Sequence, residues 1–267
     1  KRLGIALPHV VLILFSLYIV LPPLWVLRTS FVPDSQAYSV ALLPELTLAN
    51  YIKLFAKDQF ALAYMDSFIA AAGATLLGLP IAAMTGYAFA RFRTGGQASR
   101  FLVLATQMLP PVALVLPIFG LFRVAGLTNS VTGLVIAYGA LNLPFLTWIL
   151  MGFFESVPIE LEWAAMVDGA TAWSAFWRVV IPVSLPGIAA AAVLGFILAW
   201  NEFLFALILT GPTTATIPVA LAGLQSQNGV QIAEISAGVV LAVAPLLIAS
   251  RFIQQHLVRG LTFGAIK

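Results

Sequence analysis

Residues 156–186 read SVPIELEWAAMVDGATAWSAFWRVVIPVSLP and form the longest charge-rich interval between two strongly apolar segments. Two short helices are predicted here. Pro158 suits the first turn of a helix, where its missing N–H is not needed, and Gly169 suits the end of that helix. Apolar side chains recur at helical spacing in both helices: Ile159, Trp163, Met166 and Val167, then Trp173, Phe176, Trp177 and Val180. The pattern leaves two interpretations open, a helix pair lying on the membrane and a pair wedged into a protein partner.

The composition on both sides of this stretch is that of an integral membrane protein. Of the 267 residues, 61% are hydrophobic and only 9% are charged, whereas soluble proteins carry about 25% charged residues. The net charge of +3 is too small and too dispersed to indicate nucleic-acid binding. The chain has no cysteine, and His9 and His256 lack ligand spacing, so we expect neither disulfides nor a metal site.

Six segments are long and apolar enough to span a bilayer, which requires about 20 residues each. The first is too long for the apolar part of a signal peptide, so we interpret it as a retained span. We predict one all-α transmembrane domain, residues 1–267, with a first helix at 3–27, core helices within 62–255, a cytoplasmic loop at 155–183 and a tail at 256–267. The expected spans are 3–27, 67–89, 101–122, 131–154, 185–209 and 235–253.

The distribution of Lys and Arg predicts the orientation, because cytoplasmic loops carry an excess of these residues. With the N-terminus inside, nine basic residues are cytoplasmic and four are external: Lys1, Arg2, Arg91, Arg93, Arg100, Arg178, Arg251, Arg259 and Lys267 against Arg28, Lys53, Lys57 and Arg123. This orientation makes both termini and the 155–183 loop cytoplasmic.

Several polar residues lie inside the predicted spans. A carboxylate such as Glu202 costs about 2.5–3.5 kcal/mol near mid-membrane, so it should face protein or water rather than lipid. It could line a cavity or make a hydrogen bond inside the bundle. Gln107 and Asn142 lie near prolines, where unwound backbone could meet a pathway, although each alone is more often a contact between helices. The candidate pathway residues are Gln107, Asn142, Trp200, Asn201 and Glu202.

The 156–186 stretch resembles the EAA loop of ABC-importer permeases, E-A-A-x3-G-x9-I-x-L-P. Ala164-Ala165, Gly169 and Ile181-Pro182 match it, but Trp163 stands where the family has Glu. In relatives that carboxylate can pair with an Arg of the ATPase subunit, so the resemblance implies Glu162 or Glu160 as a substitute. The residues expected to contact the ATPase are Glu160, Glu162, Trp163, Ala164, Ala165, Asp168, Gly169 and Pro182.

Three further stretches resemble sugar importers. The string WNEF at 200–203 is similar to their equivalent span. Residues alone indicate a disordered tail at 258–267, yet VRGLTFGAIK resembles the tail of the smaller permease subunit of maltose-type importers, which reaches into the ATPase dimer. The tip of the 210–234 loop resembles in position the loop that enters the sugar-binding protein. The implied tail contacts are Gly260, Leu261, Thr262 and Gly264, and the implied loop contacts are Gln225, Gln227, Asn228 and Gly229.

The resemblance implies a type I ABC-importer permease that carries a neutral di- or oligosaccharide by alternating access. Its implied partners are a second permease subunit, two ATPase subunits, an extracytoplasmic sugar-binding protein and membrane lipid. The implied location is the cytoplasmic membrane of a prokaryote. The chain has no G-x-x-x-x-G-K-[ST] loop. We therefore expect no enzyme activity and no cofactor on this chain, with ATP and Mg²⁺ held by the partner ATPase.

Two other classes of membrane protein were weighed. An ion-coupled secondary transporter would need a buried ion site, and Glu202 is its one strong candidate. A membrane-embedded enzyme is disfavoured because the spans hold no cluster of His, Cys or paired carboxylates.

Overall fold

The computed structural model describes residues 2–39, 44–56, 58–92, 94–226 and 229–263. These residues are almost entirely helical, which confirms the predicted all-α membrane fold. A two-stranded antiparallel hairpin, β1 (Gln225–Ser226) and β2 (Gly229–Val230), pairs Gln225 with Val230. The chain divides into two compact units, residues 1–61 with 220–245 and residues 62–219 with 246–267; the single domain stays a prediction.

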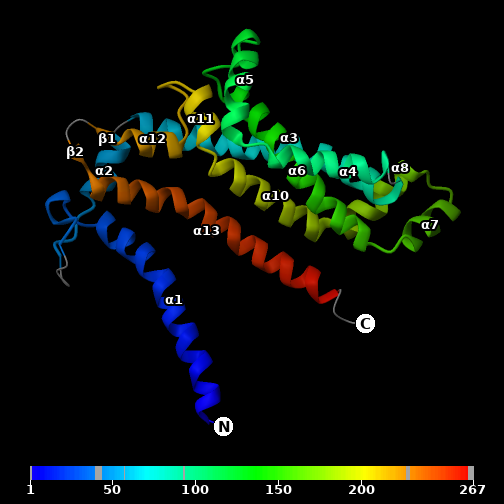
Figure 1. Ribbon diagram of the computed structural model, residues 1–267, viewed down its shortest axis with the longest axis horizontal. Coiled ribbons are helices and arrows are strands. Elements are labelled where there is room, and N and C mark those ends of the chain that lie inside the picture. The colour runs from blue at the N-terminus through cyan, green and yellow to red at the C-terminus, as the bar shows by residue number, and fades with distance from the viewer. Residues whose placement is uncertain (1, 40–43, 57, 93, 227–228, 264–267) are drawn as a thin grey trace. The chain divides into compact units, whose positions relative to one another are not determined.

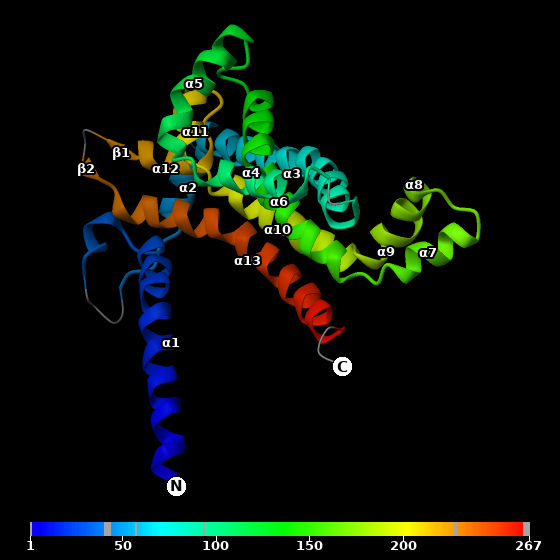
Figure 2. The same cartoon turned by 45° about the vertical axis from the view of Figure 1, so that its right-hand side comes forward.

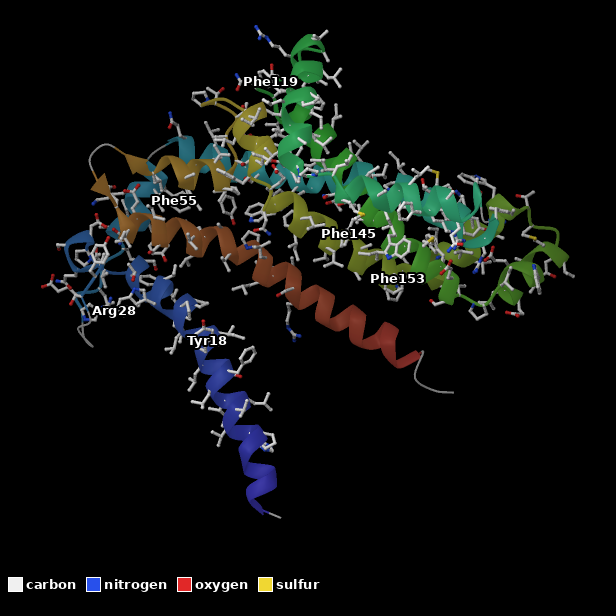
Figure 3. All side chains as sticks on the ribbon, viewed as in Figure 1. Tyr18, Arg28, Phe55, Phe119, Phe145 and Phe153 are labelled. Carbon is white, nitrogen blue, oxygen red and sulfur yellow. The ribbon has the colours of Figure 1, made fainter. Side chains whose placement is uncertain are left out.

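The first unit begins with the long apolar helix α1 (Arg2–Ser30). Its large apolar side chains from Val10 to Leu24 are exposed, as the labelled Tyr18 is in Figure 3. A helix can stand in lipid in this way because its backbone groups are satisfied internally. The short elements η1 (Asp34–Gln36) and α2 (Ala49–Ala56) follow.

Polar side chains hold the outer part of this unit together. The Asn50 side-chain amide donates to the backbone oxygens of Ser30, at 3.0 Å, and Val32, at 2.8 Å. The carboxylate of Asp34 accepts from the backbone N–H of Ala233 at 2.9 Å, in the first turn of α13 (Ile232–Phe263). Since the first N–H groups of a helix have no partner within it, this contact caps α13.

The second unit is built on α3 (Asp58–Phe92), α6 (Val131–Ser156) and α10 (Leu185–Trp200), with α6 and α10 side by side in Figures 1 and 2. Helix α4 (Gly96–Ala105), the turn η2 (Thr106–Met108) and α5 (Pro111–Val124) complete this framework with α11 (Leu204–Leu209) and α12 (Ile217–Gly223). Gly86 lets α3 approach α6 closely, since a side-chain carbon there would lie 3.0 Å from the backbone of Thr147 and Met151.

Two of the predicted spans are not continuous helices. Within the described residues, four helices are long and apolar enough to cross a membrane, or up to six if each of two bent helix pairs is one span. The third predicted span bends by 92° between η2 and α5, where Pro110 and Pro111 lack the N–H groups that would continue the helix. The fifth was wrong as one helix, because α10 ends at Trp200 and α11 begins at Leu204.

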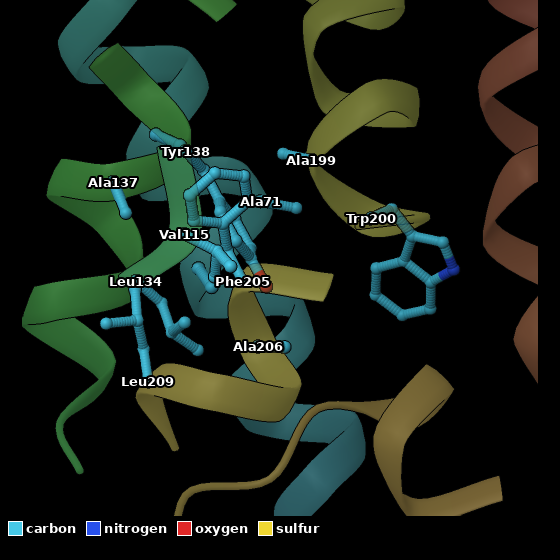
Figure 4. Close-up of a cluster of buried hydrophobic side chains, with 12 residues drawn as sticks. Ala71, Val115, Leu134, Ala137, Tyr138, Ala199, Trp200, Phe205, Ala206 and Leu209 are labelled. Carbon is cyan, nitrogen blue, oxygen red and sulfur yellow. The ribbon is translucent and has the colours of Figure 1, made fainter. Parts of the chain in front are cut away.

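Two clusters of buried apolar side chains hold this unit together. One joins α3, α5, α6, α10 and α11, with Tyr138 and Phe205 near its centre (Figure 4). The other joins α3, α6 and α10 to the loop that follows α6. This second cluster therefore fixes the root of the 155–183 loop.

Candidate functional site

The first short helix of the 155–183 loop, α7, runs over Glu160–Val167. Gly169 ends it with a positive φ of 88°, a conformation that a glycine adopts without steric cost. The N–H of Gly169 donates to the Met166 oxygen at 3.0 Å and that of Ala170 to the Ala165 oxygen at 2.9 Å. These two hydrogen bonds form a Schellman motif, so the predicted helix end is confirmed.

The second predicted helix consists of three short pieces, α8 (Ala172–Ala175), the π-turn η3 (Phe176–Val180) and α9 (Ile181–Val183). The Thr171 hydroxyl caps α8 by accepting from the N–H of Ser174 at 3.2 Å. Phe176 is fully buried, and its ring lies 4.6 Å from that of Tyr87 on α3. The apolar stripe of this segment is therefore divided, since Phe176 and Val180 are buried while Trp173 and Trp177 are exposed.

The other side of these helices presents large apolar side chains to the surface. Trp163 is 55% exposed, Trp173 60% and Val167 87%. Glu160, Ala164, Asp168, Gly169 and Pro182 are also exposed, and Ala165 is half-buried. In Figures 1 and 2, α7 and α8 lie beyond the ends of α6 and α10. Helix α7 is outside the candidate spans, while α8 begins the bent pair Ala172–Val183 and Leu185–Trp200. Grouped apolar side chains in such a position favour a protein-docking surface.

Glu162 does not belong to this exposed surface. It is 2% exposed, and both of its carboxylate oxygens are engaged within the chain. One oxygen lies 2.5 Å from the Arg91 Nε, and the other accepts from the Tyr87 hydroxyl at 2.6 Å. The expectation that Glu162 replaces the family carboxylate is thus corrected, because its charge is already paired, and Glu160 is the exposed acid of this helix.

Reasoning from the sequence missed the partners of Glu162. Arg91 entered only as a charge that sets orientation, and Tyr87 was not singled out. Their spacing of four residues places both on one face at the end of α3. That pattern could have indicated a buried acidic partner, but no sequence feature identifies Glu162 as this partner.

A pocket of about 510 Å³ brings together three of the five predicted pathway residues. Gln107 from η2, Asn142 from α6 and Glu202 from the break after α10 line it with mostly apolar neighbours. The Gln107 amide donates to the Leu141 oxygen at 2.8 Å, and the Asn142 amide donates to the Gly195 oxygen at 3.1 Å. Each amide therefore ties two elements together and still has a carbonyl oxygen that can accept another hydrogen bond.

Glu202 has a local structural role in this pocket. Its carboxylate accepts from the backbone N–H groups of Phe205 and Ala206, at 3.1 Å, in the first turn of α11. The Tyr138 hydroxyl is buried near Glu202 and Thr216. The carboxylate thus stabilises the start of α11 at the helix break.

The other two pathway candidates lie elsewhere. Trp200 is 2% exposed and packs against Tyr64, with ring centroids 5.5 Å apart, and Figure 4 shows its ring set apart from Tyr138 and Phe205. The Asn201 amide donates to the Ile197 oxygen at 2.8 Å. Neither residue lines the pocket, and their place in a pathway stays a prediction. Of residues 200–202, only Glu202, which follows the end of α10 at Trp200, lines the pocket.

The remaining candidates fall partly on residues outside the described ranges. In the outer loop, Gln225 and Gly229 belong to the paired strands, while Gln227 and Asn228 lie outside the described residues. In the tail, Gly260, Leu261 and Thr262 belong to α13, which extends eight residues beyond the predicted boundary at 255, and Gly264 lies outside the described residues.

A comparison with protein families matches residues 74–263 to the family of binding-protein-dependent transport system inner membrane components. The chain is 36% identical to a sulfoquinovosyl glycerol transport system permease protein of Agrobacterium fabrum, over 92% of this chain and 88% of that protein. It is 37% identical to a trehalose transport system permease protein of Mycobacterium tuberculosis, over 94% of this chain and 93% of that protein. It is 32% identical to a trehalose/maltose transport system permease protein of Thermococcus litoralis, over 96% of this chain and 94% of that protein.

The fold has a counterpart among solved structures. A chain of a bacterial ABC transporter that imports the acidic polysaccharide alginate superposes with a TM-score of 0.80 at 21% identity, covering 95% of this chain and 96% of that one. At this identity the likeness shows the fold alone, that of a type I ABC-importer permease.

Proposed function

We propose that this chain moves a neutral di- or oligosaccharide by alternating access. The chain belongs to the family of binding-protein-dependent transport system inner membrane components and is a permease of an ABC importer for sugars. In this proposal a partner ATPase drives the cycle and contacts the loop at 158–182. We propose further that ATP and Mg²⁺ bind the partner ATPase rather than this chain.

The exposed apolar surface of α7 and α8 carries the proposal. Trp163 and Val167 are exposed and lie outside the candidate spans, so lipid does not stabilise them there, and Trp173 is exposed at the start of the bent pair Ala172–Val183 and Leu185–Trp200. Burial against a partner would recover about 25 cal/mol for each Å² of apolar area removed from water. Ala164 and the half-buried Ala165 leave room between these larger side chains for close approach. We assign the ATPase contact to this surface, with Glu160 and Asp168 at its polar edge and Gly169 and Pro182 setting its backbone.

The pocket at Gln107, Asn142 and Glu202 supports the sugar pathway. Sugar hydroxyls lose water on entering the membrane, and amide oxygens can replace part of those hydrogen bonds. The described lining of the pocket contains no Lys or Arg, which favours a neutral sugar over an acidic one, because a buried carboxylate on the sugar would need a cationic partner.

The remaining partners follow from the family and from the sequence. The family description specifies a binding protein, and we propose that the β1–β2 tip with Gln225, Gln227, Asn228 and Gly229 contacts it. We assign a second ATPase contact to the tail at Gly260, Leu261, Thr262 and Gly264. Two ATPase subunits and a second permease subunit complete the assembly. The distribution of Lys and Arg supports cytoplasmic N- and C-termini.

The geometry does not favour an ion-coupled transporter. Such a transporter requires a carboxylate that binds or releases an ion during the cycle, whereas both oxygens of Glu202 already accept backbone N–H groups. ATP can drive import if the outward-facing state binds the ATP-closed dimer better than the inward-facing state does. The exposed surface of α7 offers the place where that difference in binding would arise.

The test is uptake by proteoliposomes that contain the assembled importer, its binding protein, and ATP inside or outside. Radiolabelled trehalose and maltose serve as neutral probes, and a uronic-acid disaccharide serves as the acidic probe. We expect uptake of a neutral probe that depends on ATP on the cytoplasmic side. Uptake driven by an ion gradient without ATP would contradict the proposal, and preference for the acidic probe would contradict its neutral-sugar part.

A further inference from the structure

The strongest polar contact between the membrane helices and the exposed loop is the one at Glu162. Its carboxylate on α7 pairs with Arg91 at the end of α3, and the side chains of the pair are only 3% and 9% exposed. The Tyr87 hydroxyl occupies the second carboxylate oxygen, and the Arg91 Nη2 donates to the Val157 oxygen at 2.7 Å. Four groups from α3, the α6–α7 turn and α7 thus meet in one buried network.

The network joins α7 to α3 more firmly than a surface ion pair could. Exposed pairs contribute little, because water and salt screen them and both side chains lose freedom. Here the charges are withdrawn from water, and each lies against a partner fixed on a different helix. Separating α7 from α3 would leave both buried charges unpaired, which a low-dielectric interior disfavours strongly. The aromatic cluster of Tyr87, Phe154 and Phe176 surrounds the same point with apolar side chains.

We infer that Arg91, Tyr87 and Glu162 are positioning residues that make α3 and α7 move as one body, so that displacement of the ATPase-contacting helix is passed to a transmembrane helix. This inference rests on the proposed ATPase contact of α7. It gives Arg91 and Glu162 a role through α7 rather than through direct contact with any partner. Trp163, which follows Glu162 in the sequence, is exposed and belongs to the surface assigned to the ATPase.

The test compares the wild-type chain with a neutral pair, Arg91→Gln with Glu162→Gln, in which no unpaired charge is left buried. The chain has no cysteine, so spin labels can be placed uniquely in it at Ile81→Cys on α3 and Leu161→Cys on α7. Both positions are exposed, and neither belongs to the surface assigned to the ATPase. The distance between the labels is measured in the assembled importer, free of nucleotide and trapped with ATP and vanadate, and also in the isolated chain. The control is Arg100→Gln with Glu155→Gln, which removes an exposed pair 3.2 Å long.

In the wild type and the control we expect one narrow distance distribution that is the same in both nucleotide states. In the neutral pair we expect the distribution to widen at least twofold, and sugar uptake for each ATP hydrolysed to fall at least tenfold. An unchanged distribution with unchanged uptake for each ATP would overturn the proposal. So would a wild-type distance that shifts on trapping, because α3 and α7 would then move separately.

Loss of folding is separated by a second measurement and a second variant. The neutral pair could lower the melting temperature. The swapped pair, Arg91→Glu with Glu162→Arg, is then expected to restore the melting temperature but not the sugar uptake for each ATP hydrolysed, which would show that the original network is needed for positioning. If restored stability also restores uptake, the network serves the fold alone and the proposal is overturned. Failure of the wild-type chain to bind any ATPase would contradict the proposed function instead. The distance between the labels in the isolated chain would still report the α3–α7 contact.

Discussion

Replacing Glu202 distinguishes the two roles considered for this carboxylate, a helix cap beside a sugar pathway and an ion site. Glu202→Gln keeps one oxygen that can accept from the N–H groups of Phe205 and Ala206, which the carboxylate contacts at 3.1 Å. It removes the negative charge at the start of α11, an interaction of about 0.3–1 kcal/mol. Glu202→Ala removes all of these contacts, which costs about 0.5–2 kcal/mol for a lost cap and more if the N–H groups stay dry.

The expected order is therefore wild type, then Gln, then Ala, both in melting temperature in detergent and in ATP-dependent uptake. A loss of 1 kcal/mol corresponds to about 2–4 °C in a protein of this size, so Gln should melt within about 4 °C of the wild type and retain at least a fifth of its uptake. Asn201→Ala is the control, since its amide contacts only the Ile197 oxygen among the described residues. A Gln variant that melts like the wild type, hydrolyses ATP normally and takes up no sugar would refute the cap and restore the ion site.

Four further variants test the 155–183 loop, the packing beneath it and the 225–231 tip. Gly169→Ala forces a side chain onto a backbone with φ of 88°, and should cost about 1 kcal/mol and weaken ATPase co-purification; equal recovery of the ATPase would contradict the docking role of α7. Ala164→Glu places a charge within the exposed apolar surface and should reduce ATPase binding at least tenfold in a pull-down, whereas unaltered binding would exclude this surface. Gly86→Val should separate α3 from α6 and cost about 1–3 kcal/mol by overpacking, measured as a lower melting temperature, while Gly152→Val, where nothing lies within 4 Å, should melt like the wild type. Shortening the 225–231 tip should reduce uptake and leave ATPase assembly intact; full uptake would identify the tip as a plain connector.

The buried network at Glu162 changes how the missing family carboxylate is understood. The sequence offered Glu160 and Glu162 as equivalent substitutes for the residue at Trp163, since both lie in the first turn of one helix. The structure separates them, because Glu162 faces Arg91 while Glu160 faces solvent. Contact with the ATPase through Trp163 would then rest on packing, with Glu160 as the nearby exposed charge.

Composition and local sequence pattern were sufficient to predict the class of the protein, the approximate spans and the helix end at Gly169. These features depend on composition, helical periodicity and the conformational preferences of glycine and proline, which are local properties of a chain. Gly169 ends its helix for a reason contained in its own backbone, so the pattern was sufficient.

The contacts between polar residues on different helices could not be predicted from the sequence. Glu162 and Arg91 lie 71 positions apart, and Gln107, Asn142 and Glu202 come from three elements that share one pocket. The break between α10 and α11 also escaped the sequence, because the apolar run continues through it and the N–H groups exposed by the break are satisfied by Glu202. Such pairings depend on the distances and directions of side chains between helices, and a single sequence does not contain that information.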